Sequence, residues 1–262
     1  MREQGDLALL KEAAKKAGEI ALRYWRQDPD VTIKADGGPV SEADLAVDAY
    51  LRETLCASRP DYGWLSEETE DNDARLCCSQ VFIVDPIDGT RAYIDGQQTW
   101  AVSLAVVTGG VPTSAVVYLP ARDKLYAAEI GGGATLNDFT ISAASSNSID
   151  SATVLASQQT LNPKHWLGPP PSFTRKMRPS LAYRLCLVAE GRFDAMLTFR
   201  KTWEWDIAGG VLIAAEAGAR VTDRHGAPLQ FNERTAQSDG AIVASPEVHT
   251  QVIHRLQRSV LP

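Results

Sequence analysis

Apolar residues recur along the first half of the chain at two different spacings. Between residues 6 and 25 they recur at helical spacing, which predicts an amphipathic helix. After a turn-rich loop over 28–39, a capping box at Ser41 and apolar residues four positions apart predict a second helix. Beyond it, short apolar runs are separated by glycine and proline turns, at 81–84, 100–107, 111–119 and 125–130. These runs predict buried strands, the last three of them in an antiparallel meander.

The second half of the chain alternates between strand-like and helix-like segments. Small polar residues at 142–151 mark the change, so we predict one sub-domain over residues 1–146 and another over 147–262. Apolar segments favour strands at 154–157, 193–199, 219–223, 229–231 and 241–245, and helices are expected over 180–190, from 206 and over 246–256. A proline-rich loop is expected over 162–179. The pattern predicts an α+β half followed by an α/β half.

Composition and charge restrict the possible functions. The chain has 262 residues, of which 44% are apolar, so it can bury a sizeable core, and no apolar run approaches the length of a membrane span. Four cysteines without Cys-x-x-Cys spacing favour neither a zinc site nor disulfides, and no secretory leader is recognisable, so we expect a cytoplasmic protein. The net charge of −7 argues against general nucleic-acid binding.

The stretch 84–90, Val-Asp-Pro-Ile-Asp-Gly-Thr, holds the strongest candidate chemistry. It follows a buried run and places Asp85 and Asp88 three residues apart, with a proline between them and a glycine after them. Such a turn can direct both carboxylates to one point beside backbone amides. Carboxylate oxygens favour Mg²⁺ over zinc or copper, and exposed amides favour a phosphate. A decorated turn is the alternative, because Pro-x-Asp-Gly is also ordinary turn chemistry.

Two motifs of the chain resemble the signatures of the inositol monophosphatase family, which comprises magnesium-dependent, lithium-sensitive phosphatases. Residues 85–90, Asp-Pro-Ile-Asp-Gly-Thr, resemble the first signature. Residues 205–210, Trp-Asp-Ile-Ala-Gly-Gly, resemble the second, Trp-Asp-x-Ala-Ala-Gly, with Gly209 in place of alanine. The resemblance covers essentially the whole chain. It implies the family's layered αβαβα sandwich and a phosphoric monoester hydrolase that uses two or three Mg²⁺ ions.

The resemblance also implies a set of metal ligands. The positions that match them are Glu67, Asp85, Asp88 and Asp206, together with the carbonyl of Ile87. Glu67 would also hold the attacking water. It lies in Ser66-Glu67-Glu68, where the family usually has Gly-Glu-Glu, so Ser66 is a departure that bears on the geometry of the loop. A simple helix cap is the alternative role for Asp206.

Two further residues match a catalytic pair of the family. Asp44 occupies the position of an aspartate that pairs with the signature threonine, here Thr90, and the pair would orient the water together with Glu67. The capping box gives Asp44 an alternative, purely structural role. The resemblance places the substrate at Asp88, Gly89, Thr90 and Asp206, with the amides of Gly89 and Thr90 against phosphate oxygens.

The sequence specifies the substrate less closely than it specifies the metal ligands. Family members that hydrolyse inositol monophosphate have a glutamate seven residues before the second-signature aspartate, and Phe199 stands there. Ser180-Leu181 and the segments 186–191 and 204–206 instead resemble the bacterial adenosine bisphosphate nucleotidases, although Ile207 replaces a threonine that is frequent in that branch. We therefore favour 3'(2'),5'-adenosine bisphosphate over inositol monophosphate. Histidinol phosphate and fructose bisphosphate remain open.

A basic loop, residues 164–178, has two interpretations. Its cations are Lys164, His165, Arg175, Lys176 and Arg178. The loop is either solvated or a lid whose cations meet a second phosphate. A regulatory or protein-binding member of the same fold, with weak or no phosphatase activity, is the alternative function. A homodimer is the usual state of the family.

Overall fold

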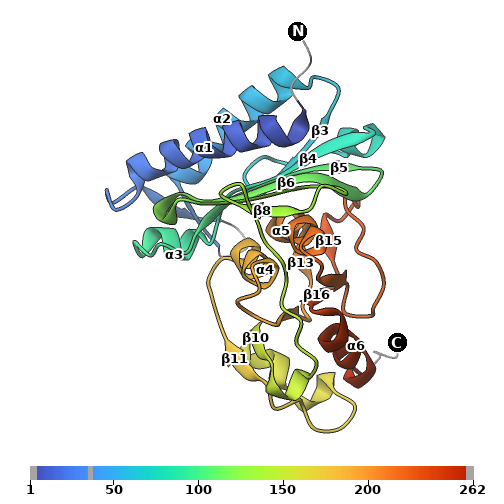
Figure 1. Cartoon of the computed structure of the whole chain (residues 1–262). Coiled ribbons are helices and arrows are strands. Elements are labelled where there is room, and N and C mark those ends of the chain that lie inside the picture. Colours follow the sequence, from blue (N-terminus) through green and yellow to red (C-terminus); the bar gives the residue numbers. More distant parts are fainter. Residues whose placement is uncertain (1–4, 35–37, 258–262) are drawn as a thin grey trace.

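Residues 5–34 and 38–257 are described by the computed structural model, and they form five layers (Figure 1). Two helices cover a seven-stranded sheet, two more helices lie between it and a five-stranded sheet, and a last helix covers the far side. The αβαβα sandwich that the resemblance implies is therefore confirmed. The largest buried apolar cluster contains side chains from both sides of residue 146, so both halves share a core, and the boundary itself stays a prediction.

The outer layer consists of α1 (Asp6–Tyr24) and α2 (Glu42–Ser58), the two helices that apolar spacing predicts. Both bury their apolar faces against the large sheet. The capping box at Ser41 forms as predicted. Where a loop was expected, β1 (Val31–Ile33) and β2 (Pro39–Ser41) pair as a short antiparallel hairpin. The centre of that expected loop, residues 35–37, lies outside the described residues.

The large sheet carries the first signature on its second strand. Its strands, in spatial order, are β3 (Gly63–Ser66), β4 (Gln80–Asp88), β5 (Ala101–Thr108), β6 (Val111–Leu119), β7 (Lys124–Glu129), β8 (Ala134–Leu136) and β9 (Phe139–Thr140). β3 and β4 are parallel, and the remaining pairs are antiparallel, which confirms the predicted meander. β4 continues beyond the predicted run through both aspartates, and α3 (Thr90–Ile94) begins after Gly89.

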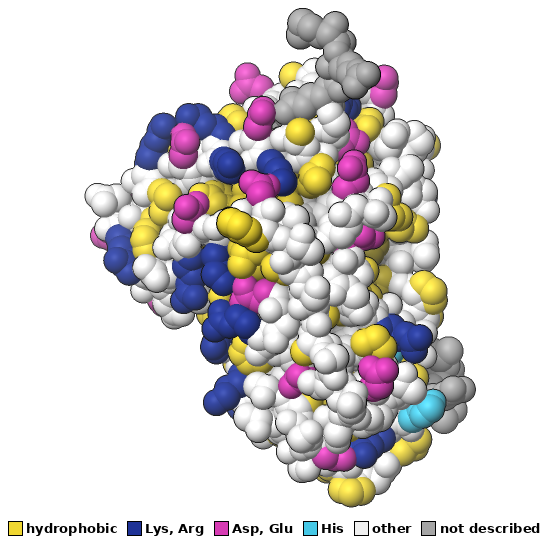
Figure 2. All heavy atoms as spheres, in the orientation of Figure 1, with side chains coloured by type: hydrophobic (Ala, Val, Ile, Leu, Met, Phe, Trp, Pro, Cys, Tyr) yellow, Lys and Arg dark blue, Asp and Glu magenta, His cyan; other side chains and the backbone are white. Residues whose placement is uncertain are grey.

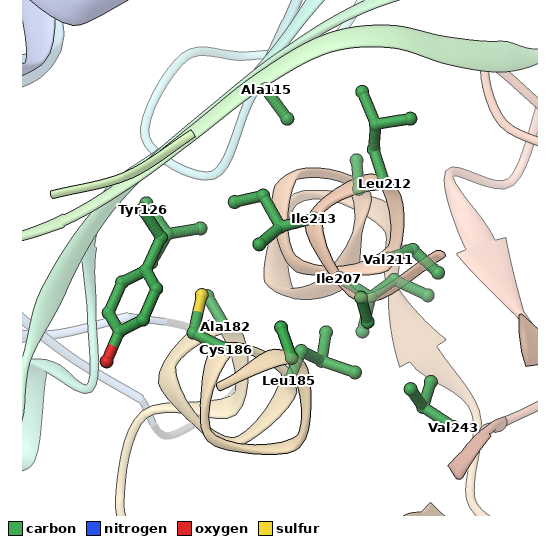
Figure 3. Close-up of a cluster of buried hydrophobic side chains, with 14 of the residues drawn as sticks. Ala115, Tyr126, Ala182, Leu185, Cys186, Ile207, Val211, Leu212, Ile213 and Val243 are labelled. Carbon is green, nitrogen blue, oxygen red and sulfur yellow. The ribbon is translucent and has the colours of Figure 1, made fainter. Parts of the chain in front are cut away.

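The middle layer, α4 (Leu181–Ala189) and α5 (Glu204–Glu216), is the apolar centre of the molecule. Figure 3 shows side chains of both helices, among them Cys186 and Ile213, gathered with Tyr126 of the sheet. Glycine lets the two helices approach closely, because a Cβ on Gly210 would lie 2.5 Å from the Cβ of Leu185. This close packing fixes the position of the second signature at the start of α5.

The second sheet and its covering helix complete the fold. Its strands, in spatial order, are β11 (Thr174–Lys176), β10 (Thr153–Ala156), β12 (Ala195–Thr198), β16 (Ala241–Ala244) and β14 (Arg220–Thr222), and α6 (Pro246–Arg255) covers the outer face. A separate pair joins β13 (Thr202–Trp203) to β15 (Gln237–Ser238).

Two expectations for this half are wrong. The segment 162–179 is not entirely loop, because it contains β11, and residues 229–231 form no strand. Phe231 is nevertheless buried in the core, so the apolar residues there reflect packing rather than strand pairing.

Candidate active site

The parallel pairing of β3 and β4 brings two acidic residues to the same sheet edge. Ser66 pairs with Val84 in the register, so Glu67, directly after β3, and Asp85, within β4, occupy the next positions of the two neighbouring strands. The amide of Glu67 also donates to the carbonyl of Val84 at 3.2 Å. In open α/β sheets the carboxyl ends of strands are the usual place of ligand sites. The local fold therefore positions both residues at one site.

Three of the predicted metal ligands converge at this edge. Carboxylate oxygens of Asp85, Asp88 and Asp206 lie within 4.8 Å of one another. At an effective dielectric constant of about 20, two full charges at that separation repel by roughly 3 kcal/mol. Burial raises the pKa of Asp85 well above its ordinary value, and the charges of Glu67, Asp88 and Asp206 raise it further. The cluster is therefore unfavourable unless protons or cations neutralise it.

Asp85 gives the clearest indication that the site binds a metal ion. Its side chain is 1% exposed, and neither carboxylate oxygen has a hydrogen-bond partner among the described residues. Buried polar atoms without a partner are rare and costly in folded proteins. Oxygen ligands that carry negative charge are those that Mg²⁺ prefers. The donor set around Asp85 therefore fits a hard divalent cation.

Asp88 is oriented by the second half of the chain. One of its oxygens, Oδ2, accepts hydrogen bonds from Ser180 Oγ and from the amide of Ala182, both at 2.6 Å. Burial raises the pKa of Asp88 to about 6, although these hydrogen bonds lower it. Sequence reasoning missed this role of Ser180. The signal for it was a serine at the first position of the helix predicted over 180–190, where its side chain also accepts from the amide of Tyr183.

Asp206 projects from the first turn of α5. The helix begins at Glu204 after the cap residue Trp203, so the alternative role of Asp206 as the helix cap is wrong. Burial raises the pKa of Asp206 well above its ordinary value, and Asp88 and Glu67 raise it further, whereas Arg200 and Arg184 lower it. Asp206 thus belongs electrostatically to the same cluster as the residues of β4.

Asp44 makes the contacts that both of its interpretations require, to the cap residue Ser41 and to Thr90. Its Oδ2 accepts from the amide of Ser41 at 2.9 Å and from the hydroxyl of Ser41, and its Oδ1 accepts from Thr90 Oγ1 at 3.3 Å. The same hydroxyl of Thr90 lies 3.2 Å from the carbonyl oxygen of Ile87. Burial raises the pKa of Asp44, although the bonds from Ser41 lower it. The cap of α2 therefore also orients the threonine of the first signature.

Glu67 lies beside the three-carboxylate group rather than within it. Lys34 Nζ donates to Glu67 at 2.9 Å and to Glu68 at 2.7 Å. Burial raises the pKa of Glu68 to about 7, although the hydrogen bond from Lys34 lowers it. The sequence did not indicate this contact, because Lys34 follows β1 and is separated from Glu67 by β2, the whole of α2 and β3. One ammonium group thus neutralises part of the negative charge at this edge.

A polar cavity of about 270 Å³ lies in the C-terminal half. Its lining consists of Ser157, Gln159, Thr160, Lys164, His165, Thr198, Phe199, Arg200 and Arg224. Phe199 packs its ring against His165 and Trp166, with centroids 5.2 and 5.7 Å away. Figure 2 shows that Lys and Arg side chains also gather along one edge of the molecule, level with α3 and α4. Basic groups are therefore concentrated locally despite the negative net charge.

The basic loop divides into two parts. Lys164 and His165 line the cavity, whereas Arg175, Lys176 and Arg178 do not. Arg175 donates to the carbonyl of Ala156, and Arg178 to that of Met177. Sequence reasoning did not identify Arg200 and Arg224 as neighbours of Lys164, because both arginines are far from Lys164 in the chain.

The fold and the acidic site together define a metal-dependent phosphatase. The chain belongs to the inositol monophosphatase family, whose model matches residues 4–261. An inositol-1-monophosphatase of Rhizobium meliloti (strain 1021) is 33% identical, covering 92% of this chain and 96% of that protein. A histidinol-phosphatase of Chlorobaculum parvum (strain DSM 263 / NCIMB 8327) is 31% identical, covering 84% and 86%. These relatives are phosphatases that differ in the substrate named for them.

A solved structure agrees with this assignment. The extragenic suppressor protein suhB from Bartonella henselae superposes with a TM-score of 0.81 at 27% identity, covering 96% of this chain and 98% of that one. Of the helices that the structure describes, none is long and apolar enough to cross a membrane. The family assignment makes the chain a hydrolase of the phosphatase class, and the family depends on metal ions.

Proposed function

We propose that the chain is a Mg²⁺-dependent phosphomonoesterase that hydrolyses a small phosphorylated metabolite. The residues that would hold two or three Mg²⁺ ions are Glu67, Asp85, Asp88 and Asp206, with the carbonyl of Ile87. The observation that carries the proposal is the buried carboxylate of Asp85, which has no hydrogen-bond partner among the described residues. A cation is the group that satisfies its oxygens while relieving the repulsion from Asp88 and Asp206.

The other site residues would bind and orient the reactants. When bound, Mg²⁺ supplies Lewis-acid chemistry that neutralises phosphate oxygens and the developing charge. Thr90, held by Asp44, and Glu67 would orient the attacking water. The amides of Gly89 and Thr90 would hold phosphate oxygens. Water forms the new bond to phosphorus as the bond to the leaving oxygen breaks, and that oxygen takes up a proton.

For the substrate we favour 3'(2'),5'-adenosine bisphosphate over inositol monophosphate. The cavity supports this choice, because Lys164, Arg200 and Arg224 can attract a second phosphate. Phe199 is itself 8% exposed and cannot bond the hydroxyls of an inositol ring. Arg200 also lowers the pKa of Asp206, which indicates that the cavity and the acidic cluster are electrostatically coupled.

The test compares phosphate release from adenosine 3',5'-bisphosphate and from inositol 1-phosphate, in Mg²⁺ and in chelator, with Asp88→Asn as the inactive control. We expect turnover of the bisphosphate that chelator and the substitution both abolish. Lys164→Met should raise KM for the bisphosphate about tenfold. Lys176→Met, in the same loop but outside the cavity, should leave KM unchanged. Faster turnover of inositol 1-phosphate would overturn the substrate choice and retain the phosphatase.

The homodimer, the cytoplasmic location and the alternative of a regulatory, protein-binding role stay predictions. An active enzyme with an intact set of carboxylates would remove the reason for the regulatory alternative, since a pure binding protein does not need four mutually repelling acids.

A further inference from the structure

Asp48 is a buried carboxylate outside the set of residues that the family signatures mark. It lies on α2, one turn after Asp44, and is 7% exposed. Its Oδ1 accepts a short hydrogen bond from Ser66 Oγ, and its Oδ2 accepts from Thr69 Oγ1 at 2.6 Å. Each carboxylate oxygen therefore accepts a hydrogen bond from a hydroxyl group of one segment, residues 66–69.

This segment carries the proposed metal ligand Glu67. Ser66 is the last residue of β3, and the backbone bends at residues 67–69. Ser66 and Thr69 flank Glu67 and Glu68, so Asp48 accepts a hydrogen bond from each end of the segment. Ser66 Oγ lies 3.4 Å from the amide of Glu68, which adds a contact within the segment. A glycine at position 66 could not supply the hydroxyl that makes these contacts.

The segment needs such a restraint because Glu67 is repelled by the rest of the site. Glu67 carries the same charge as Asp85, and the pairing of β3 with β4 places both residues at one edge of the sheet, so moving Glu67 outward would lower the electrostatic energy of the metal-free site. Lys34 opposes this movement through the side chain of Glu67. Asp48 opposes it through the backbone segment, and hydrogen bonds to a carboxylate are about twice as strong as neutral ones.

We propose that Asp48 is a positioning residue that holds segment 66–69 so that Glu67 faces Asp85, and that it thereby sets the affinity of the site for Mg²⁺. The inference rests on the proposed function, because it takes Glu67 as a metal ligand. A single helix then presents two carboxylates with separate tasks. Asp44 orients Thr90, and Asp48 orients the segment of Glu67.

The test compares variants that keep the hydrogen bond between residue 69 and Asp48 with variants that remove it. Thr69→Val removes the hydroxyl at nearly constant volume, Thr69→Ser retains it, and Asp48→Asn leaves one acceptor where two are needed. Mg²⁺ binding to the full chain is measured by calorimetry. Ser245→Ala is the matched control, because Ser245 is also buried and donates to Ser146 in the C-terminal half.

We expect the dissociation constant for Mg²⁺ to rise about tenfold in Thr69→Val and Asp48→Asn, as for other residues that orient metal ligands. Thr69→Ser and Ser245→Ala should stay within about twofold of the unsubstituted chain. At saturating Mg²⁺, kcat should be nearly unchanged. Hydrogen exchange of the amides of residues 67–69 in metal-free protein should speed up in Thr69→Val and not in Thr69→Ser.

Three outcomes would overturn the proposal. Unchanged Mg²⁺ binding in both Thr69→Val and Asp48→Asn would remove the role of Asp48 and leave the phosphatase intact. Equal loss in Thr69→Val and Thr69→Ser would assign the effect to packing. Absence of Mg²⁺ binding in the unsubstituted chain would overturn the proposed function as well. If Asp48→Asn does not fold, the two variants of Thr69 still decide whether the hydrogen bond to Asp48 sets the affinity for Mg²⁺.

Discussion

Ser180 Oγ donates a hydrogen bond to Asp88 Oδ2 at 2.6 Å, although the two residues are 92 positions apart. The bond joins the cap of α4 to the end of β4, so a carboxylate of the first half is oriented by a helix of the second. Because Oδ2 is engaged in this way, Oδ1 is the oxygen that remains for the acidic cluster. The geometry of the site therefore depends on correct packing of both halves.

Ser180→Ala should raise the pKa of Asp88 further above 6, because the substitution removes a bond that now lowers it. A metal ion needs the ionised carboxylate, so Mg²⁺ affinity should fall and the acid limb of its pH dependence should move to higher pH. We expect kcat/KM to fall roughly tenfold at neutral pH. The measurement is Mg²⁺ affinity between pH 5 and 8, at about one-unit intervals. An unshifted acid limb would contradict this role of Ser180.

The acidic cluster should make the metal-free protein less stable as pH rises. Raised pKa values mean that the folded state holds protons more tightly than the unfolded state, so this stability is present at low pH. For Asp88 it is lost between the ordinary value of 3.8 and about 6. Asp85→Asn removes one of the repelling charges and should stabilise the metal-free protein at pH near 7.5 by about 2 kcal/mol.

Thermal unfolding with and without Mg²⁺ checks this prediction. Mg²⁺ should raise Tm of the unsubstituted chain near pH 7.5 and have a smaller effect near pH 5, where protons compete for the carboxylates. In Asp85→Asn the response to Mg²⁺ should be largely lost. A metal-free Asp85→Asn protein that unfolds at a lower temperature than the unsubstituted chain at pH near 7.5 would be evidence against the repulsion.

The two roles of Asp44 can be separated by substitution. Thr90→Val removes the hydroxyl that Asp44 accepts from and should lower kcat by about 10²-fold, with a small effect on stability. Ser41→Ala removes the hydroxyl that bonds Asp44 at the cap and should cost about 1 kcal/mol of stability. Steady-state kinetics and urea unfolding of both variants give the comparison. Loss of kcat only in Ser41→Ala would reverse the assignment.

Gly210→Ala should destabilise the fold by about 1 to 3 kcal/mol, because the new Cβ would lie 2.5 Å from the Cβ of Leu185. Gly209→Ala restores the family's residue and should cost less. Its Cβ would meet the flexible Ser103 Oγ at 2.9 Å, and a hydroxyl can rotate away. Equilibrium unfolding in urea measures the stability of both variants. Equal stability of Gly210→Ala and the unsubstituted chain would show that the helices can separate without penalty.

Local patterns were sufficient to predict most elements of the fold. The helical spacing before residue 25 and the capping box at Ser41 predicted α1 and α2, and the short apolar runs predicted the meander. Periodicity failed at 229–231, where apolar side chains pack into the core without strand pairing. It also failed for β11, whose polar residues join the edge of a sheet through the backbone.

The candidate site was predictable only where residues match a motif. The signatures identified Asp85, Asp88 and Asp206, and the structure brings their carboxylates together. Ser180 could be predicted as a helix cap but not as the partner of Asp88, and nothing local indicated the bond from Lys34 to Glu67, because long-range contacts depend on how the layers pack. Ser66 appeared in the sequence as a departure from glycine, and its bond to a buried carboxylate is visible only in the folded chain.

Mg²⁺-dependent release of phosphate from adenosine 3',5'-bisphosphate, compared between the unsubstituted chain and Asp85→Asn, tests the central claim most directly. The account predicts turnover that rises with Mg²⁺ concentration, stops in chelator and falls by at least about 10³-fold in the variant. Calorimetry on the same samples should show Mg²⁺ binding only in the unsubstituted chain. Turnover that survives in chelator or in Asp85→Asn would contradict a reaction carried by this carboxylate cluster.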